Sequence, residues 1–192
     1  IIGCLVDIYF AYGGGVWLEG SSSEFIMEGG SIEHCVVNSP SHGYGGGVCA
    51  TGAAGDPAGG ARFTMTGGSI TECSVSGRLS GNGGGVGITP ELGGRPVCTM
   101  SGSAFIGSNT ARTVYYSNLL SGDNICISGG IMHANGGTMA ASPAGSNNCS
   151  LYNYSRGLIT GGSSETTIFK GYVVNRSYAT ISGGKFMDTV LN

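Results

Sequence analysis

The sequence predicts an all-β solenoid, in which coils of three short strands stack on one another. Three observations predict it. A long motif recurs along the chain, and a second motif, GGGV, follows successive copies of it at a similar spacing. Glycine supplies 39 of the 192 residues without a collagen-like period. Recurrence at a spacing of this size is typical of repeat proteins, whose single units cannot bury an apolar face alone.

The clearest motif is apolar-x-Met-x-Gly-Gly-Ser-Ile-x-x-Cys-x-Val, at 25–37 and again at 63–75. A third copy starts at Cys98, a fourth is assigned to 125–137 and a last one to 179–191, while Ile1 enters within a repeat. Equivalent residues of stacked coils lie about 4.8 Å apart and form continuous columns. The expected columns are Phe25/Phe63/Cys98/Ile125, Met27/Met65/Met100/Ile127 and Ile32/Ile70/Ile106/Met132.

Each repeat divides into three strands separated by glycine corners. In "FIM" and "FTM" apolar residues alternate with others, which is the period of a strand with one buried face. Gly-Gly then ends the strand, because glycine accepts positive φ and allows a sharp change of direction. The GGGV segments at 13–16, 45–48 and 83–86 begin a further strand. A helix is disfavoured, since each glycine costs about 1 kcal/mol relative to alanine there.

We expect one domain over 1–192, with repeats clear over 1–137 and 179–191 and degenerate over 138–178. In the degenerate part, "NCSLYNYS" and "TTIFKGYVV" are expected to supply strands, and insertions such as "ATGAAGDPAGGA" to form loops. Neither end shows a polar cap, which solenoids normally need, and uncapped strands pair with other chains. We therefore expect either a segment of a longer array or a head-to-tail filament.

Composition excludes several functions. The 19 charged residues give a net charge of −3 without a basic stripe, so nucleic acid is not expected as a partner. No apolar run approaches the roughly 20 residues that span a bilayer, so no membrane span is expected in this segment. The seven cysteines contain no CxxC pair, which disfavours a zinc ribbon.

The elements GGGV, FTMTGGSI and Ile-x-x-Cys/Asn-x-small resemble the repeats of glycine-rich right-handed parallel β-helix proteins of the bacterial surface, such as autotransporter-like and polymorphic outer membrane proteins. The resemblance implies a right-handed parallel β-helix of about six coils with an extracellular or cell-surface location. It also implies a structural role, as part of a fibre or adhesin stalk. The chain departs from that pattern where cysteine replaces asparagine, while Asn109 and Asn135 are assigned to restore it.

The column of Cys4, Cys35 and Cys73 is the most unusual feature of the repeats. It could form a disulfide or a metal-binding ladder, or it could fill a narrow corner with small buried side chains. We favour buried thiols, because free cysteine is among the most buried residue types and three thiols form at most one bond among themselves. Glu33, His34 and His42 do not suggest a metal site, since neighbouring strand residues point to opposite faces.

No catalytic residue, cofactor site or metal site is predicted. Carboxylates are scattered over the repeats, whereas acid-base catalysis on sugars requires two at a fixed separation. Three N-x-S sequons, at Asn148, Asn153 and Asn175, are possible glycan acceptors in a secreted chain. The expected partners are the chain itself, neighbouring repeats or surface glycans. The alternative function is a carbohydrate-binding or polysaccharide-cleaving β-helix, which an acidic or aromatic exterior groove would favour.

One exterior array is also considered. Threonine and serine recur beside the inward-facing methionine position, a pattern that could order surface water as in some antifreeze proteins, although threonine simply suits exposed strand positions. Cysteine and glutamate interrupt the array, which weakens the antifreeze interpretation. Its expected members are Thr64/Thr66, Thr99/Ser101, Cys126/Ser128 and Thr180/Ser182.

Overall fold

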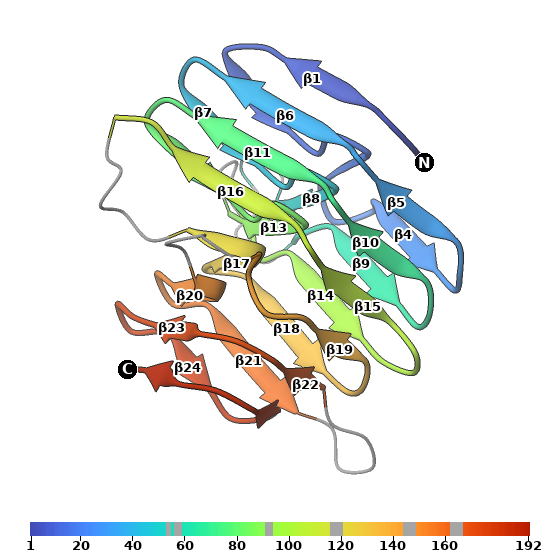
Figure 1. Cartoon of the computed structure of the whole chain (residues 1–192), viewed down its shortest axis with the longest axis vertical. Coiled ribbons are helices and arrows are strands. Elements are labelled where there is room, and N and C mark those ends of the chain that lie inside the picture. Colours follow the sequence, from blue (N-terminus) through green and yellow to red (C-terminus); the bar gives the residue numbers. More distant parts are fainter. Residues whose placement is uncertain (53–54, 56–58, 91–93, 116–120, 144–148, 162–166) are drawn as a thin grey trace.

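The chain forms a parallel β-helix, seen in a computed structural model that describes residues 1–52, 55, 59–90, 94–115, 121–143, 149–161 and 167–192. Within these residues there are 26 strands, no helix, and five sheets in which all strand pairs are parallel. The strands stack in chain order, from the N-terminal coil to the C-terminal coil (Figure 1). The predicted all-β solenoid is confirmed.

Three sheets, A, D and E, run the whole length of the solenoid. Sheet A contains β5 (Ser31–Glu33), β10 (Ser69–Thr71), β15 (Phe105–Gly107), β19 (Thr138–Met139), β22 (Ile168–Phe169) and β25 (Lys185–Phe186). Sheet D contains β3 (Val16–Glu19), β8 (Val48–Thr51), β13 (Val86–Thr89), β17 (Gly122–Ser128), β20 (Cys149–Tyr154), β23 (Val173–Asn175) and β26 (Val190–Leu191). Sheet E contains β4 (Glu24–Met27), β9 (Arg62–Met65), β14 (Val97–Met100), β18 (Ile131–Ala134), β21 (Leu158–Gly161) and β24 (Thr180–Ile181).

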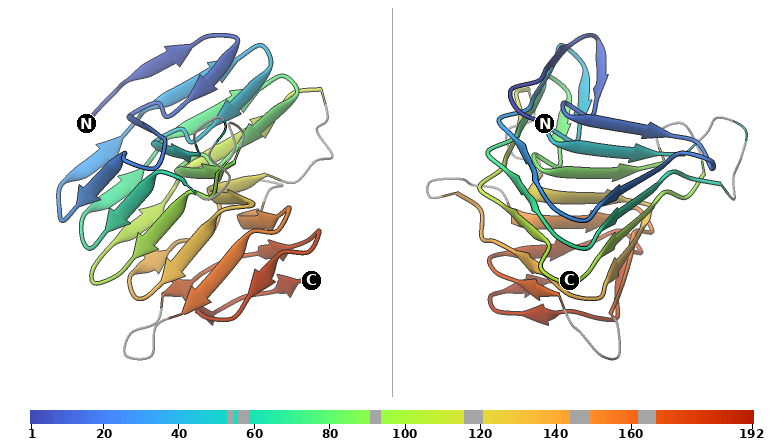
Figure 2. Two further views of the ribbon diagram at one scale, coloured as in Figure 1. Left: turned by 180° about the vertical axis from the view of Figure 1, so that it is seen from behind. Right: turned by 90° about the vertical axis from the view of Figure 1, so that its right-hand side faces the viewer.

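Two further sheets occur only in the N-terminal part, so the expected three strands per coil describe the C-terminal coils alone. Sheet B contains β1 (Leu5–Asp7), β6 (Val36–Ser39), β11 (Ser74–Gly77) and β16 (Thr110–Thr113). Sheet C contains β2 (Phe10–Tyr12), β7 (His42–Tyr44) and β12 (Ser80–Asn82). These two sheets enclose a small apolar cluster of their own, formed by Ala11, Val37, Val75 and Ala111 with Val6 against it. We call this part the lobe; it occupies the upper part of both views in Figure 2.

The register of the first three repeats agrees with the expected columns. Phe25 pairs with Phe63, which pairs with Cys98, and Ile32, Ile70 and Ile106 align in the same way. The strands expected in the degenerate part are also present, as β20, β22 and β23. All these inward-facing columns join one core that extends through every coil.

The fourth repeat was assigned to the wrong sheet. Met132 pairs with Cys98 in sheet E, whereas Ile125 and Ile127 pair with Val86 and Ile88 in sheet D. The fourth member of the isoleucine column is Met139 rather than Met132. The error has a physical cause: both strands alternate inward apolar residues and both precede glycines, so a period of two cannot tell one face of the coil from another.

The GGGV motif connects sheet C to sheet D, and each of its glycines is required for a different physical reason. The first glycine turns the chain with positive φ, 64° at Gly45. The second, Gly46, lies against the Gly84 and Ser74 carbonyl oxygens, so a Cβ there would overlap backbone atoms. A Cβ on the third, Gly47, would lie 2.7 Å from Cγ2 of Ile70. The motif therefore encodes a close backbone approach as well as a turn.

The lobe ends where two polar side chains replace a further strand. The Oδ1 of Asp123 accepts a hydrogen bond from the Ala111 N–H (2.9 Å), and the Oδ1 of Asn124 accepts one from the Asn109 N–H (3.2 Å). Both side chains are fully buried. They satisfy N–H groups of the last lobe strand that the next coil would otherwise bond, which avoids the cost of orphaned donors.

Candidate functional surfaces

The Cys4, Cys35 and Cys73 column lies where the chain turns from sheet A into sheet B. The residue that precedes each cysteine has a positive φ, as at His34 (54°) and Glu72 (55°). The Cys73 thiol donates to the carbonyl oxygens of Thr71 (3.4 Å) and of Ile32 in the preceding coil (3.6 Å). The cysteine side chain thus helps to satisfy backbone carbonyls at the corner.

Asn109 continues this column and makes stronger contacts there. Its Nδ2 donates to the Ile70 carbonyl (3.0 Å), and its Oδ1 accepts from the Cys73 N–H (2.9 Å). Asn135, in contrast, follows β18 and its N–H bonds the Met100 carbonyl, so its assignment to this column is wrong. The error follows from the misplaced fourth repeat.

None of the seven cysteines forms a disulfide, and all but Cys4 are buried. Burial raises the pKa of Cys73 to about 12 and also raises that of Cys35. A thiol with so high a pKa remains protonated near neutral pH and is a poor nucleophile and metal ligand. The geometry is that of a buried thiol column.

A second group of thiols lies at the outer face of sheet D, and the repeat pattern did not predict it. Cys126 and Cys149 are almost completely buried, and burial raises both pKa values, that of Cys149 to about 12. Burial also raises the pKa of the neighbouring Tyr152. Only the corrected register, which places Ile125 in sheet D, would have located Cys126 on its outer face.

The sequons do not present free acceptors where the structure describes them. Asn153 is completely buried, and its Nδ2 donates to Asn175 Oδ1 (2.8 Å). The Asn175 Nδ2 in turn donates to Asn192 Oδ1 (3.0 Å). The folded chain leaves no room for a glycan on Asn153, because its amide nitrogen lies inside an asparagine ladder. Asn175 is bonded within the same ladder. Asn148 lies outside the described residues.

The exterior threonine array has different members from those expected. On sheet E, Thr64 pairs with Thr99, Thr99 pairs with His133, and His133 pairs with Thr160. The His133 Nδ1 lies 2.8 Å from Thr160 Oγ1. Cys126 belongs to sheet D, and Thr180 belongs to the adjacent column through Leu158. Ile26 and His133 interrupt the column, so it does not form the flat hydroxyl array of the antifreeze interpretation.

Histidine and carboxylate side chains do not converge on a metal site within the described residues. His34 forms an exposed ion pair with Glu72 (3.1 Å), while His42 stacks on Phe10 with a ring separation of 5.8 Å. Exposed pairs of this kind contribute little to stability, about 0–1 kcal/mol. The part of the chain that is described also contains no helix long and apolar enough to cross a membrane.

Aromatic side chains stack along the first two coils of the lobe. Tyr12 lies between Trp17 and Tyr44, with ring separations of 5.4 and 5.6 Å and nearly parallel planes. Trp17 and Phe10 keep about half of their surface exposed. In the third coil the paired positions hold Ser80 and Asn82, so the aromatic ladder is confined to the N-terminal end.

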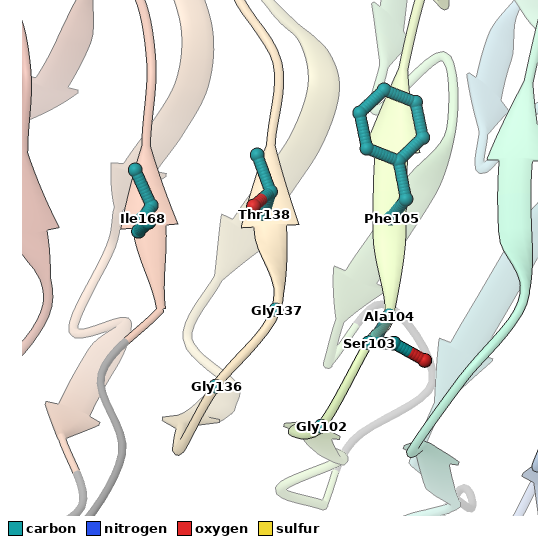
Figure 3. A pocket seen from close by; sticks show the side chains of 8 residues that line it. All are labelled: Gly102, Ser103, Ala104, Phe105, Gly136, Gly137, Thr138 and Ile168. Atoms are coloured by element: carbon teal, nitrogen blue, oxygen red, sulfur yellow. The ribbon is translucent and has the colours of Figure 1, made fainter.

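A hollow lies on the outer side of sheet A. It has a volume of about 420 Å³, and glycines from the corners between sheets E and A border it (Figure 3). Phe105, Thr138 and Ile168 stand beside one another on adjacent strands above these corners. Its lining among the described residues is Gly102, Ser103, Ala104, Phe105, Gly136, Gly137, Thr138 and Ile168, and none of these side chains is ionisable.

Comparison with known proteins finds no relative of the chain. No family model matches the chain, and no curated protein or solved structure matches it either.

Proposed function

We propose that the chain is a structural segment of an extracellular or cell-surface fibre or adhesin stalk, in which the solenoid supplies length and stiffness. The observation that supports this role is the continuous pairing of sheets A, D and E through every coil, with a register shift between Gly122 and Ile125 in sheet D and one continuous core beneath the sheets. A body built in this way bends only if many inter-coil hydrogen bonds and core contacts distort together. The resemblance to surface β-helix repeats points in the same direction.

Extension along the axis is part of the proposal. Within the described residues, the end strands of sheets D and E and the last strand of sheet A, β25, have an unpaired edge, with which further coils of a longer chain or of a second copy would pair. The first strand of sheet A, β5, is instead bonded by Ile1, Ile2 and Gly3. Charge favours head-to-tail contact between copies, because residues 1–61 contain six carboxylates and no lysine or arginine. Arg156, Lys170, Arg176 and Lys185 lie toward the other end. Sheets B and C would not continue across such a junction, since they end at β16 and β12.

Two experiments test the role. An antibody raised against the folded chain should label intact cells of the source organism, and labelling only after permeabilisation would contradict a surface location. Pulling the chain from its two ends in single-molecule force spectroscopy should give stepwise release of coils, because each coil contacts only its neighbours. Smooth extension at low force would contradict a mechanical role.

A test of assembly separates the two modes of extension. Sedimentation at increasing protein concentration should show species growing by whole chains if copies stack head to tail, and added salt should reverse that growth because complementary charges are screened. A monomer at every concentration would exclude the filament, and the solenoid could then be extended only by further coils of the same chain.

A further inference from the structure

We propose that the outer face of sheet A binds an acidic polysaccharide, with the ring of Phe105 stacking on a sugar and Lys170 and Lys185 pairing with its carboxylates. This site is separate from the structural role proposed above, since it uses side chains that face away from the core. Its parts come from β15 and from the strands of sheet A that follow it along the chain.

The Phe105 ring is held in place with one face free. The side chain points outward from β15 and keeps 37% of its surface exposed. Its ring lies across Gly107, where an added Cβ would be 2.7 Å from Cζ and 2.9 Å from Cε1. Gly107 is buried as a result, and the ring presents its face outward (Figure 3). A ring already fixed by its own strand loses little freedom when a ligand stacks on it.

The hollow beside the ring provides the remaining contacts of a small-molecule site. Its volume of about 420 Å³ falls in the range of ligand-binding clefts. Gly102 and Gly137 border the hollow, and the Thr138 side chain lies on its wall, whereas the Ser103 hydroxyl points away from Thr138 and Ile168 (Figure 3). An apolar ring with a hydroxyl group beside it suits a sugar, whose C–H groups meet the electron-rich ring face while its hydroxyls hydrogen-bond.

Charge distinguishes an acidic sugar from a neutral one. The chain has two lysines, and both lie on this face. Lys185 pairs with Ile168 across β22 and β25, and Lys170 directly follows β22. Adjacent strands are about 4.8 Å apart, so the backbone of Lys185, three strands from Phe105, lies roughly 14 Å across the sheet from it, and Lys170 follows a strand roughly 10 Å away, a span of about three sugar units. Among the described residues, no carboxylate forms an ion pair with either lysine.

A peptide or a nucleic acid fits this face less well. The strands β15, β19 and β22 are paired on both sides, so a peptide cannot add a strand to them. Two lysines are too few to hold a phosphate backbone, which requires many basic contacts. The sheet also carries Glu33 on β5, so an anionic ligand is directed from β15 toward β25.

The test is calorimetric titration of the full chain with oligogalacturonate, a carboxylate sugar. Neutral malto-oligosaccharide and poly-glutamate serve as probes of sugar and of charge alone. We expect binding of oligogalacturonate only, weakened by salt. Phe105→Ala should weaken it about 2- to 10-fold, the range of an aromatic contact. Lys170→Gln with Lys185→Gln should weaken it about fivefold, as expected for exposed ion pairs.

Matched variants guard against loss of folding. Phe105→Leu keeps apolar bulk over Gly107 but removes the flat ring, so it should weaken binding as Phe105→Ala does. Phe10→Ala and Arg62→Gln remove an exposed ring and an exposed cation from other sheets and should leave binding unchanged. The proposal is overturned if no oligogalacturonate binds, if poly-glutamate binds equally well, or if the Phe105 variants bind like the unaltered chain.

Discussion

At the residue scale, glycine and cysteine side chains are selected by the space between coils. Gly46 lies so close to the carbonyl oxygens of Gly84 and Ser74 that no side chain fits, whereas Gly29 has no atom near its missing Cβ. The two residues belong to equally glycine-rich motifs, yet only one is required by packing. Sequence alone cannot separate them, because the crowding comes from neighbouring coils.

We expect Gly46→Ala to destabilise the chain by about 1–3 kcal/mol or more, because the new methyl group would displace backbone in two coils. Gly29→Ala is the matched control and should change stability by less than about 0.5 kcal/mol. Urea unfolding followed by circular dichroism measures both. Equal effects of the two substitutions would show that the tight approach at Gly46 is not a constraint.

The buried thiols predict a specific loss of stability at alkaline pH. Burial raises the pKa of Cys98 and Cys149 to about 12 from a usual value of 9.0. The folded state therefore holds these protons more tightly than the unfolded state, so the stabilisation is complete below pH 9 and is lost as pH rises toward 12. Urea midpoints between pH 8 and 11 should fall, and the fall should be smaller in Cys98→Ala. A pH slope that Cys98→Ala does not change would contradict this origin.

At the element scale, the corners and the end of the lobe are determined by side chains that satisfy backbone groups. Asn109 bonds two coils through both atoms of its amide, and Asn124 bonds the Asn109 N–H and, through Nδ2, the Ala140 carbonyl (2.9 Å). Sheet C ends at β12 and sheet B at β16, so the coils pass from five strands through four to three. At the end of sheet B these contacts satisfy the Asn109 N–H, and Asp123 satisfies that of Ala111. In the sequence, the segment "GDN" at 122–124 marks the change in the number of strands per coil, but it does not recur with the repeats.

Asn124→Ala should cost about 1–3 kcal/mol, because it leaves the buried Asn109 N–H without an acceptor. Asn38→Ala, on an exposed position of β6, is the control and should be nearly neutral. Thermal unfolding of the two variants provides the measurement. A neutral Asn124→Ala would mean that water or a backbone shift replaces the contact.

At the scale of the whole molecule, the solenoid has a gradient of stability. The central strands β8, β13 and β17 are paired on both sides and buried on both faces, whereas β24, β25 and β26 have two residues each and one partner. In a linear array the energy of a coil comes from its own contacts and from those with its neighbours. The C-terminal coil should therefore open first.

Hydrogen exchange followed by mass spectrometry should find the slowest amides in β8, β13 and β17 and the fastest in β24, β25 and β26. Protection should fall progressively toward the ends, because terminal coils lack one neighbour. Uniform protection along the chain would indicate a single cooperative unit and would contradict a coil-by-coil description.

The sequence by itself determined the all-β fold, the stacking of repeats and the register of the first three coils, because an alternation of apolar residues and a recurring glycine corner are local properties. Only the tertiary structure decided that the first coils have five strands, that Ile125 belongs to sheet D, and that Asn153 is buried in a ladder. It also brought Phe105, Lys170 and Lys185, far apart in the sequence, onto one face. These features depend on which strand lies above which, and strands on different faces of a coil share one period of two.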